Sequence, residues 1–265
     1  MWPPALLPDT RLMKSRVVWV LVIVGTIFAL APLPGLASVR QPMAWSGCRQ
    51  QVGVFPAGAE DAAAHLPAGY SPVAFQDSSP AGATSLPAPP GATAAVQLTA
   101  TTCADDGKAP VTVAQLWVYV DPPAEMEADG VDAYVVVLWA AASTRGTAQY
   151  LAWAGLPAVH AAATNELDAA GMVRLGKAQI GANARVSTVV PAGPEDARSE
   201  RLRLIGVRDQ VVLGTVDFVE ERHVHLLGAA ELELGPTMPL RTPRTSGVGI
   251  HVSEPYVLTW VPVRS

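Results

Sequence analysis

The chain has 265 residues, of which 50% are hydrophobic and only 15% are charged, and its formal net charge is −5. An acidic chain lacks the basic surface with which proteins displace counterions from nucleic acid, so we expect no nucleic-acid partner. The length suffices for one large or two small domains. The sequence shows no repeat and no internal boundary, which favours a single domain.

Residues 1–38 have the charge profile of an export signal. The strongly apolar stretch Val17–Leu30 follows three cationic side chains, Arg11, Lys14 and Arg16. Ala37 and Ser38 are small enough for a signal peptidase, so we predict a signal peptide cleaved near Ala37. The alternative is an N-terminal membrane anchor over residues 17–38, since about 20 apolar residues suffice to cross a bilayer. Both readings predict a secreted or extracytoplasmic bacterial protein that meets the membrane only through this segment.

Two cysteines follow the export signal, Cys48 and Cys103. An even number of cysteines in an oxidising compartment predicts that they form a disulfide bond with each other. Between them runs a segment rich in Pro, Ser, Gly and Ala (77–93), which buries little apolar area. We therefore expect residues 39–110 to be an N-terminal segment that packs on the body of the domain.

From residue 95 onward the sequence shows apolar and β-branched runs separated by turn residues. These runs predict strands over Ala95–Thr102, Val111–Val120, Ala133–Ala141, Arg185–Val190, Arg201–Val207, Val211–Val219, Val224–Leu227, Glu231–Leu234, Val248–Val252 and Tyr256–Val263. A helix is predicted over Thr147–Ala154, ended by Gly155, and Ala158–Ala169 fits a helix or a strand. Residues 111–265 thus form the β-rich core of a mainly β (α+β) domain, an antiparallel β-barrel or sandwich with one or two short helices.

The common signatures of hydrolases, NTPases, zinc proteases and thiol oxidoreductases are absent from the sequence. His223 and His225 are separated by one residue, so on a strand both point to one face, as a metal site requires. Cupin barrels pair such histidines with a glutamate, and Glu231 lies downstream, at a longer spacing than in cupins. The alternative is that both histidines lie on a solvated strand face, and no cofactor is indicated.

Lys177 is one of two lysines after residue 38 and is a candidate amine nucleophile. The positive charge of the neighbouring Arg174 could favour the unprotonated, nucleophilic form of its amine. The alternative is an exposed loop or strand edge. The acidic loop from Asp121 to Asp132 could gather calcium, but its spacing fits a solvated hairpin connection better. Aromatic side chains could line a pocket mouth or pack in the core, namely Trp117, Tyr119, Tyr134, Trp139, Tyr150 and Trp153.

The order of Leu66–Val73, the strand Ala133–Ala141, the helix Thr147–Ala154 and the turn Gly155-Leu156-Pro157 resembles the layout of acetoacetate-decarboxylase-like β-barrel proteins. In that family a strand leads into a short helix and a Gly-x-Pro turn beside a barrel cavity. The resemblance implies the barrel fold. The lysine nucleophile of that family belongs to a motif with Glu and Lys that this sequence lacks.

From these features we expect a non-catalytic envelope or extracellular module that binds a small apolar ligand. The alternative is an enzyme that uses the barrel cavity, either of the acetoacetate-decarboxylase-like type or dependent on a metal. The sequence alone leaves enzyme activity uncertain.

Overall fold

A computed structural model describes residues 42–78, 93–105, 108–170, 172–191, 196–224, 228–241 and 244–262. The chain divides into two units, Met1–Val39 and Arg40–Ser265, and all the described residues belong to the second. The predicted signal peptide or anchor over residues 1–38 lies outside the described residues. Within the described ranges, no helix is long and apolar enough to cross a membrane.

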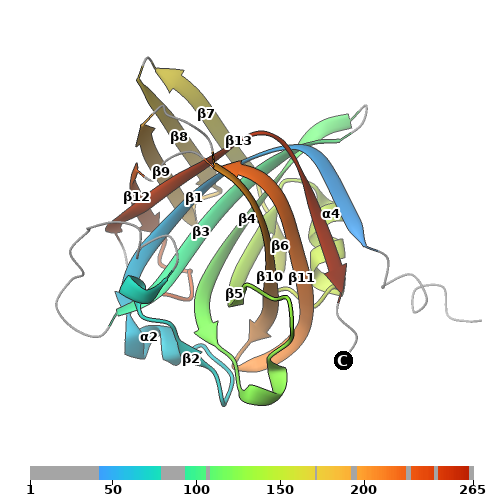
Figure 1. Cartoon of the computed structure of the whole chain (residues 1–265), viewed down its shortest axis with the longest axis vertical. Helices are drawn as coiled ribbons and strands as arrows, with labels where there is room; N and C mark the ends of the chain where they lie inside the picture. The colour runs from blue at the N-terminus through green and yellow to red at the C-terminus, as the bar shows by residue number, and fades with distance from the viewer. Residues whose placement is uncertain are drawn as a thin grey trace, which may run out of the picture. The chain divides into compact units, whose positions relative to one another are not determined.

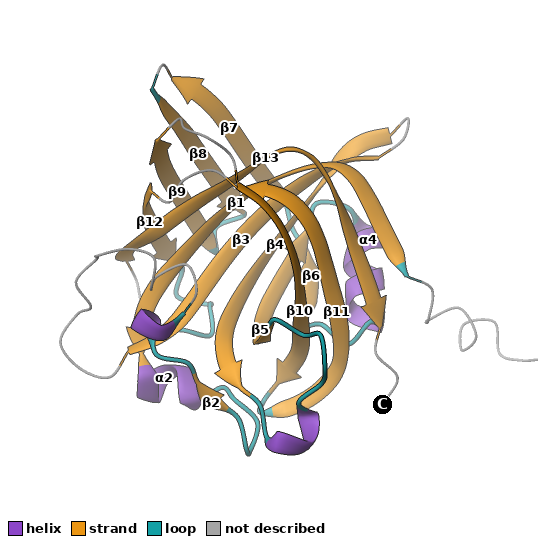
Figure 2. Cartoon of the chain, in the orientation of Figure 1, coloured by secondary structure: helices purple, strands orange, loops and turns teal. Residues whose placement is uncertain are grey.

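The second unit is built almost entirely of strands, with a few short helices (Figures 1 and 2). The elements in chain order are β1 (Met43–Gly58), α2 (Ala59–Ala63), β2 (Ser71–Pro72), η1 (Phe75–Asp77), β3 (Thr93–Asp105), β4 (Lys108–Asp121), η2 (Ala124–Met126), β5 (Ala133–Ala142), α4 (Arg145–Trp153), β6 (Ala158–His160), β7 (Ala163–Ala170), β8 (Val173–Ile180), β9 (Ala184–Pro191), β10 (Asp196–Arg208), β11 (Val211–Val224), β12 (Gly228–Leu234) and β13 (Arg244–Pro262). The mainly β fold class predicted from the sequence is confirmed.

Seven strands close into a ring, in the order β1-β3-β4-β5-β10-β11-β13 and back to β1. All the neighbours in this ring are antiparallel except β5 and β10, which are parallel. The ring closes because β1 pairs with β3 through one edge and with β13 through the other. We call this ring the barrel. Closure leaves none of its strands as an open edge at these pairings.

The remaining long strands form a second sheet region that continues from β13 in the order β12, β9, β8, β7. We call these four strands the extension. β12 pairs with the N-terminal half of β13, whereas β11 pairs mainly with its C-terminal half. The 19-residue strand β13 therefore belongs to both the barrel and the extension.

The strands β3 and β4 are buried on both faces. One face is mainly apolar, with Val96, Leu98 and Leu116, and packs in one cluster with Ala178, Val186 and Leu232 of the extension. The opposite face belongs to a second cluster together with residues of β5, β10, β11, β13 and α4. The polar side chains of these two strands are therefore buried as well as the apolar ones.

Most of the strands and the helix predicted from the sequence are confirmed, with shifts of a few residues at their ends. Ala158–Ala169, which fits a helix or a strand, contains β6 and begins β7. The two strands predicted over Val248–Val252 and Tyr256–Val263 are one strand, β13, because the Glu254-Pro255 break between them does not interrupt the extended backbone. The sequence analysis missed β1 and β8. Residues 225–227 of the run Val224–Leu227 lie outside the described residues.

The predicted disulfide between Cys48 and Cys103 is confirmed. It joins β1 to β3, and both cysteines are buried, at 0% and 2% exposure. The Pro-rich segment that it encloses lies largely outside the described residues, between Ser78 and Thr93. A disulfide is typical of proteins that fold in an oxidising compartment.

The disulfide is expected to stabilise the protein mainly by restricting the unfolded chain. For cysteines separated by 55 residues, the loop-entropy model gives about 4 kcal/mol. We expect the double variant Cys48→Ala/Cys103→Ala to lose about this much free energy of unfolding in guanidinium denaturation. Reductant should then lower the stability of the wild type and leave the double variant unchanged. Equal stability of both proteins without reductant would contradict this prediction.

Candidate functional site

The interior of the barrel is identified by three aromatic side chains that meet across it. The ring of Phe218 on β11 lies 5.9 Å from that of Trp117 on β4 and 5.1 Å from that of Trp260 on β13, both edge to face. β4 and β11 are not neighbours in the ring, so their side chains can touch only through its inside. The face that carries Trp117 and Phe218 is therefore the inner face.

The same inner face carries a group of uncharged polar side chains on β1, β3 and β4, which we call the polar belt. Its members are Gln50, Gln97, Thr99, Thr101, Gln115 and Tyr119, identified by their register with Trp117. Gln50, Gln97, Thr99, Thr101 and Gln115 are all at most 5% exposed. Gln50 donates from Nε2 to Thr101 Oγ1 at 3.0 Å. The hydroxyl of Tyr119 donates to Gln97 Oε1.

Four buried polar atoms on the inner face have no hydrogen-bond partner within the described residues. They are Thr99 Oγ1, Gln115 Nε2, Trp117 Nε1 and Trp260 Nε1. Each buried polar group without a partner costs about 1–3 kcal/mol. Such groups are rare in folded proteins, and several of them on one interior face indicate a place that exchanges hydrogen bonds with a bound molecule or water.

The helix α4 packs against the barrel at the turn Gly155-Leu156-Pro157. It starts at Thr144, whose Oγ1 accepts a hydrogen bond from the backbone N–H of Thr147 at 3.3 Å. It ends before Gly155, where φ is +90°, and a Cβ on Gly206 of β10 would lie 1.8 Å from the Gly155 carbonyl oxygen. Only glycine permits this approach, and Leu151 and Leu156 lie in the same buried cluster as Trp117. The helix and its turn thus lie directly on the inner face of the barrel strands.

A second buried polar cluster lies on the other face of β1, where the extension packs. His251 on β13 and Thr188 on β9 are 2% and 1% exposed, and Nε2 of His251 bonds to Oγ1 of Thr188. Thr188 Oγ1 also bonds to Gln51 Oε1 at 3.2 Å, and Gln51 Nε2 donates to Asn165 Oδ1 at 2.7 Å. Asn165 Nδ2 donates to the carbonyl oxygen of Arg49 at 3.3 Å. We call His251, Thr188, Gln51 and Asn165 the tie.

The hydrogen bonds of the tie have one consistent direction. A backbone carbonyl can only accept, so Arg49 fixes the amide of Asn165, and Asn165 in turn fixes the amide of Gln51. Gln51 Oε1 then accepts the single proton of the Thr188 hydroxyl. That hydroxyl can only accept from His251, whose Nε2 must carry a proton. In this arrangement His251 does not act as a base toward Thr188, and the tie is a cross-link between β1, β7, β9 and β13.

A substitution at Gly176 on β8 tests the packing of the tie. A Cβ at Gly176 would lie 2.3 Å from Thr188 Oγ1, 2.6 Å from Gln51 Oε1 and 2.7 Å from His251 Nε2. We expect Gly176→Ala to lower the free energy of unfolding by about 1–3 kcal/mol in urea denaturation, the usual cost of overpacking. The matched control is Gly146→Ala in the first turn of α4, where nothing lies within 4 Å. This control should be neutral or stabilising, and equal losses in both variants would refute the assigned packing.

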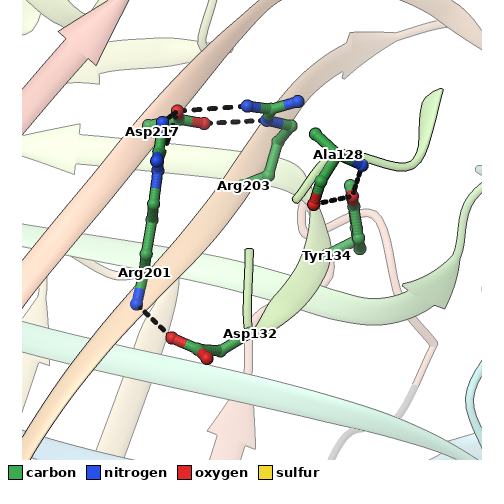
Figure 3. A network of polar contacts seen from close by, with 6 residues as sticks. All are labelled: Ala128, Asp132, Tyr134, Arg201, Arg203 and Asp217. Carbon is green, nitrogen blue, oxygen red and sulfur yellow. Dashed lines mark hydrogen bonds and ion pairs between the residues drawn. The ribbon is translucent and has the colours of Figure 1, made fainter. Parts of the chain in front are cut away.

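The outer face of β10 and β11 carries a charged network (Figure 3). Arg203 binds the carboxylate of Asp217 through Nε at 2.7 Å and Nη2 at 3.1 Å, and Arg201 binds the same carboxylate. Asp217 is 3% exposed. Burial alone would raise the pKa of Asp217, but the hydrogen bonds from Arg203 and Arg201 outweigh it and hold the pKa below its usual value. Nearby, Asp132 accepts from the backbone N–H of Arg201 at 2.7 Å.

The lowered pKa of Asp217 predicts a pH-dependent contribution to stability. The stabilisation is complete above the unfolded-state pKa of about 3.9 and is lost as the pH falls through the lower folded-state value. We expect Asp217→Asn to cost about 2–3 kcal/mol at pH 7, less than for a fully buried pair because Arg201 is partly solvated. The variant should also lose this part of the acid-side decline, as measured by urea denaturation between pH 2 and pH 7. Asp168→Asn on the exposed strand β7 is the control, and an identical pH profile in both variants would contradict the prediction.

Three solved structures with a similar fold are enzymes by their descriptions. The enduracididine biosynthesis enzyme MppR, complexed with the condensation product of pyruvate and imidazole 4-carboxaldehyde, has a TM-score of 0.55 and 13% identity, covering 87% of this chain and 93% of that chain. An acetoacetate decarboxylase-like enzyme from Sphingomonas wittichii RW1 has a TM-score of 0.50 and 12% identity, covering 89% and 98%. A structure from studies of acetoacetate decarboxylase has a TM-score of 0.50 and 10% identity, covering 88% and 92%. No protein-family model and no curated protein matches the sequence.

The chain has the acetoacetate-decarboxylase-like fold. The resemblance inferred from the strand, helix and Gly-Leu-Pro turn is confirmed at this level. The expectation of a non-catalytic binding module is wrong, because the structural neighbours are enzymes and support the enzyme alternative instead. At these low identities the similarity concerns the fold and not the substrate.

Within this acetoacetate-decarboxylase-like fold, the structure describes the side chain of Lys177 but not those of His223 and His225. Lys177 lies on β8 of the extension, is exposed and alternates with the buried Gly176 and Ala178. The catalytic role of Lys177 stays a prediction. Its position, away from the barrel interior, gives that role no support. His225 and the side chain of His223 lie outside the described residues, so the metal hypothesis stays a prediction too. The carboxylates of the loop Asp121–Asp132 are exposed, as a solvated connection between β4 and β5 requires.

Of the aromatic residues singled out in the sequence, Trp117 and Tyr119 lie on the inner face of the barrel. Trp153 is 61% exposed on α4. The glutamine and threonine side chains of the polar belt were missed. Their signal was present in the sequence: Gln97, Thr99 and Thr101 alternate with apolar residues in β3, and Gln115 follows the same pattern in β4. Such alternation usually indicates a solvent-facing side, and only the closed ring shows that this side faces the interior.

Proposed function

We propose that the protein is an enzyme that binds a small carbonyl compound inside the barrel and stabilises negative charge on its oxygen by hydrogen bonds. The observation that supports this proposal most directly is the set of unpaired N–H donors on the inner face, from Gln115, Trp117 and Trp260. Buried donors aimed at a carbonyl oxygen favour reactions in which that oxygen gains negative charge. Enzymes with this fold add support.

Tyr119 adds an ionisable group to the proposed site. It belongs to the polar belt on the inner face, and its hydroxyl donates a hydrogen bond to Gln97 Oε1. To act as a general acid the phenol must turn its single proton from Gln97 Oε1 to a substrate carbon or oxygen, and the bond to Gln97 holds the hydroxyl in position until then. Tyr119 is our candidate general acid, whereas Gln115 and the two tryptophans stabilise the charged oxygen.

The proposed chemistry does not pass through a lysine imine. After residue 38 the sequence has only two lysines, Lys108 and Lys177. Lys177 is exposed on the extension, and the side chain of Lys108 lies outside the described residues. Among the described inner-face side chains there is no amine. The enzyme would therefore rely on hydrogen bonds where an imine-forming enzyme relies on a covalent bond.

We further propose that this enzyme works outside the cytoplasm. Two observations support this: the disulfide between Cys48 and Cys103 and the charge profile of residues 1–38. Both belong to proteins that pass through an oxidising compartment.

Turnover of a panel of ketones, keto esters and keto acids, followed by proton NMR with purified protein, tests the proposed function. We expect Gln115→Met to reduce kcat by about tenfold or more, because a preorganised donor is lost at the charged oxygen. The matched control Gln179→Met, on the exposed side of β8, should keep full activity. Lys177→Ala should also stay active, and borohydride should trap no adduct on the wild type.

Absence of turnover across the panel would overturn the proposed enzyme. Full activity of Gln115→Met would remove the polar belt as the site, and a borohydride adduct on Lys177 would replace the hydrogen-bonded mechanism by an imine.

A further inference from the structure

We propose that the site in the barrel selects an uncharged substrate with two or more oxygen acceptors, such as a keto ester or a lactone, over the corresponding carboxylate. This inference rests on the proposed function and names the substrate class of the same site. It follows from the hydrogen-bond donors and acceptors of the inner face and from the positions of the charged side chains.

The unpaired atoms of the inner face are mainly donors. An indole N–H and an amide NH₂ can only donate, so Trp117 Nε1, Trp260 Nε1 and Gln115 Nε2 each require an acceptor. Thr99 Oγ1 can donate or accept. A ligand that satisfies this set must offer oxygen atoms at more than one position.

Each hydrogen bond within the polar belt pairs one donor with one acceptor and so leaves this excess of donors unchanged. Tyr119 engages the carbonyl oxygen of the Gln97 side chain, which turns the amide nitrogen of Gln97 the other way. Gln50 engages the hydroxyl oxygen of Thr101. The tie differs in this respect, since each of its donors meets an acceptor of the protein down to the carbonyl of Arg49.

Among the side chains that the structure describes, the barrel interior offers no counter-charge to a carboxylate. Each lysine or arginine with a described side chain is exposed, apart from Arg174 on the extension and Arg203 on the outer face of β10. Arg203 and Arg201 are already bound to Asp217. A carboxylate that enters the interior would lose its hydration without gaining an ion pair from any of these described side chains, whereas an ester loses far less hydration.

The aromatic walls fit the apolar part of such a molecule. Trp117, Phe218 and Trp260 are each at most 1% exposed and form a continuous edge-to-face series inside the ring. Apolar groups of an ester or lactone can pack on these rings while their oxygens meet the indole N–H groups at the ring edges. The interior therefore matches a compact molecule with an apolar body and oxygen acceptors.

A matched pair of stable probes tests this inference: methyl levulinate, an uncharged keto ester, and levulinate, the keto acid of the same skeleton. Binding to the purified protein is measured by titration calorimetry and ligand-observed NMR. We expect the ester to bind at least tenfold more tightly than the acid at pH 7. Trp260→Phe and Trp117→Phe keep a ring but remove the N–H donor, and each should weaken ester binding by about tenfold, the value of one buried hydrogen bond.

Trp153→Phe is the control, because Trp153 is 61% exposed on α4 and should leave ester binding unchanged. Near-ultraviolet circular dichroism checks the fold of each variant, and Gln115→Met gives a donor deletion without an aromatic change. Tighter binding of the acid, or no binding of either probe, would overturn the neutral-substrate inference. So would ester binding that all three donor deletions leave unchanged. Turnover of keto acids in the separate panel would then leave the proposed enzyme standing without this selectivity.

Discussion

The pairing of β1 with β13 is the constraint on which the rest of the structure depends. These strands lie at opposite ends of the described chain, and their register runs from Met43 opposite Trp260 to Val54 opposite Val248. Without this pairing the sheet would be open, and the side chains of β3 and β4 that now face inward would face solvent. The same strand β13 also holds β12, so one element connects the barrel to the extension. Ring closure therefore creates both the inner face with its polar belt and the packed outer face against the extension.

Closure produces two buried polar clusters on opposite faces of β1, beginning at the adjacent residues Gln50 and Gln51. The tie, reached through Gln51, contains a protein acceptor for each donor along its length and joins four strands. The polar belt, reached through Gln50, contains two buried polar atoms without a partner among the described residues, Thr99 Oγ1 and Gln115 Nε2. Burial of polar groups is tolerated when hydrogen bonds compensate for the lost hydration. In the tie these hydrogen bonds all come from other protein groups. The two atoms of the belt lack this compensation within the described part of the chain, and this difference separates a structural cluster from a candidate site.

Local sequence patterns were enough to locate most strands, the helix before the Gly155-Leu156-Pro157 turn and the disulfide. They failed for β1 because its sequence, rich in Gly, Gln and single apolar residues, has no clear period. They failed for β8 because Gly176 and Lys177 suggest a loop. In the structure Gly176 is in a strand, and a glycine is needed there because a Cβ would clash with atoms of the tie. The site was missed for a different reason. Whether Gln115 faces water or the interior depends on which strands close the ring, and that information is carried by pairings between distant residues. Lysine and histidine suggest a site from their residue type alone, whereas amides and indoles at ordinary strand positions do not.

The position of the disulfide has a consequence for how the interior site keeps its shape. Cys48 and Cys103 lie two residues along their strands from Gln50 and Thr101, which are opposite each other and hydrogen-bonded. The register of β1 and β3 changes between Ser46 and Arg49, so backbone pairing alone does not hold the two strands rigidly there. The covalent bond fixes their separation at this irregular point. The side chains that would meet a ligand are thus held in place before the ligand arrives, and less conformational entropy is lost when it binds.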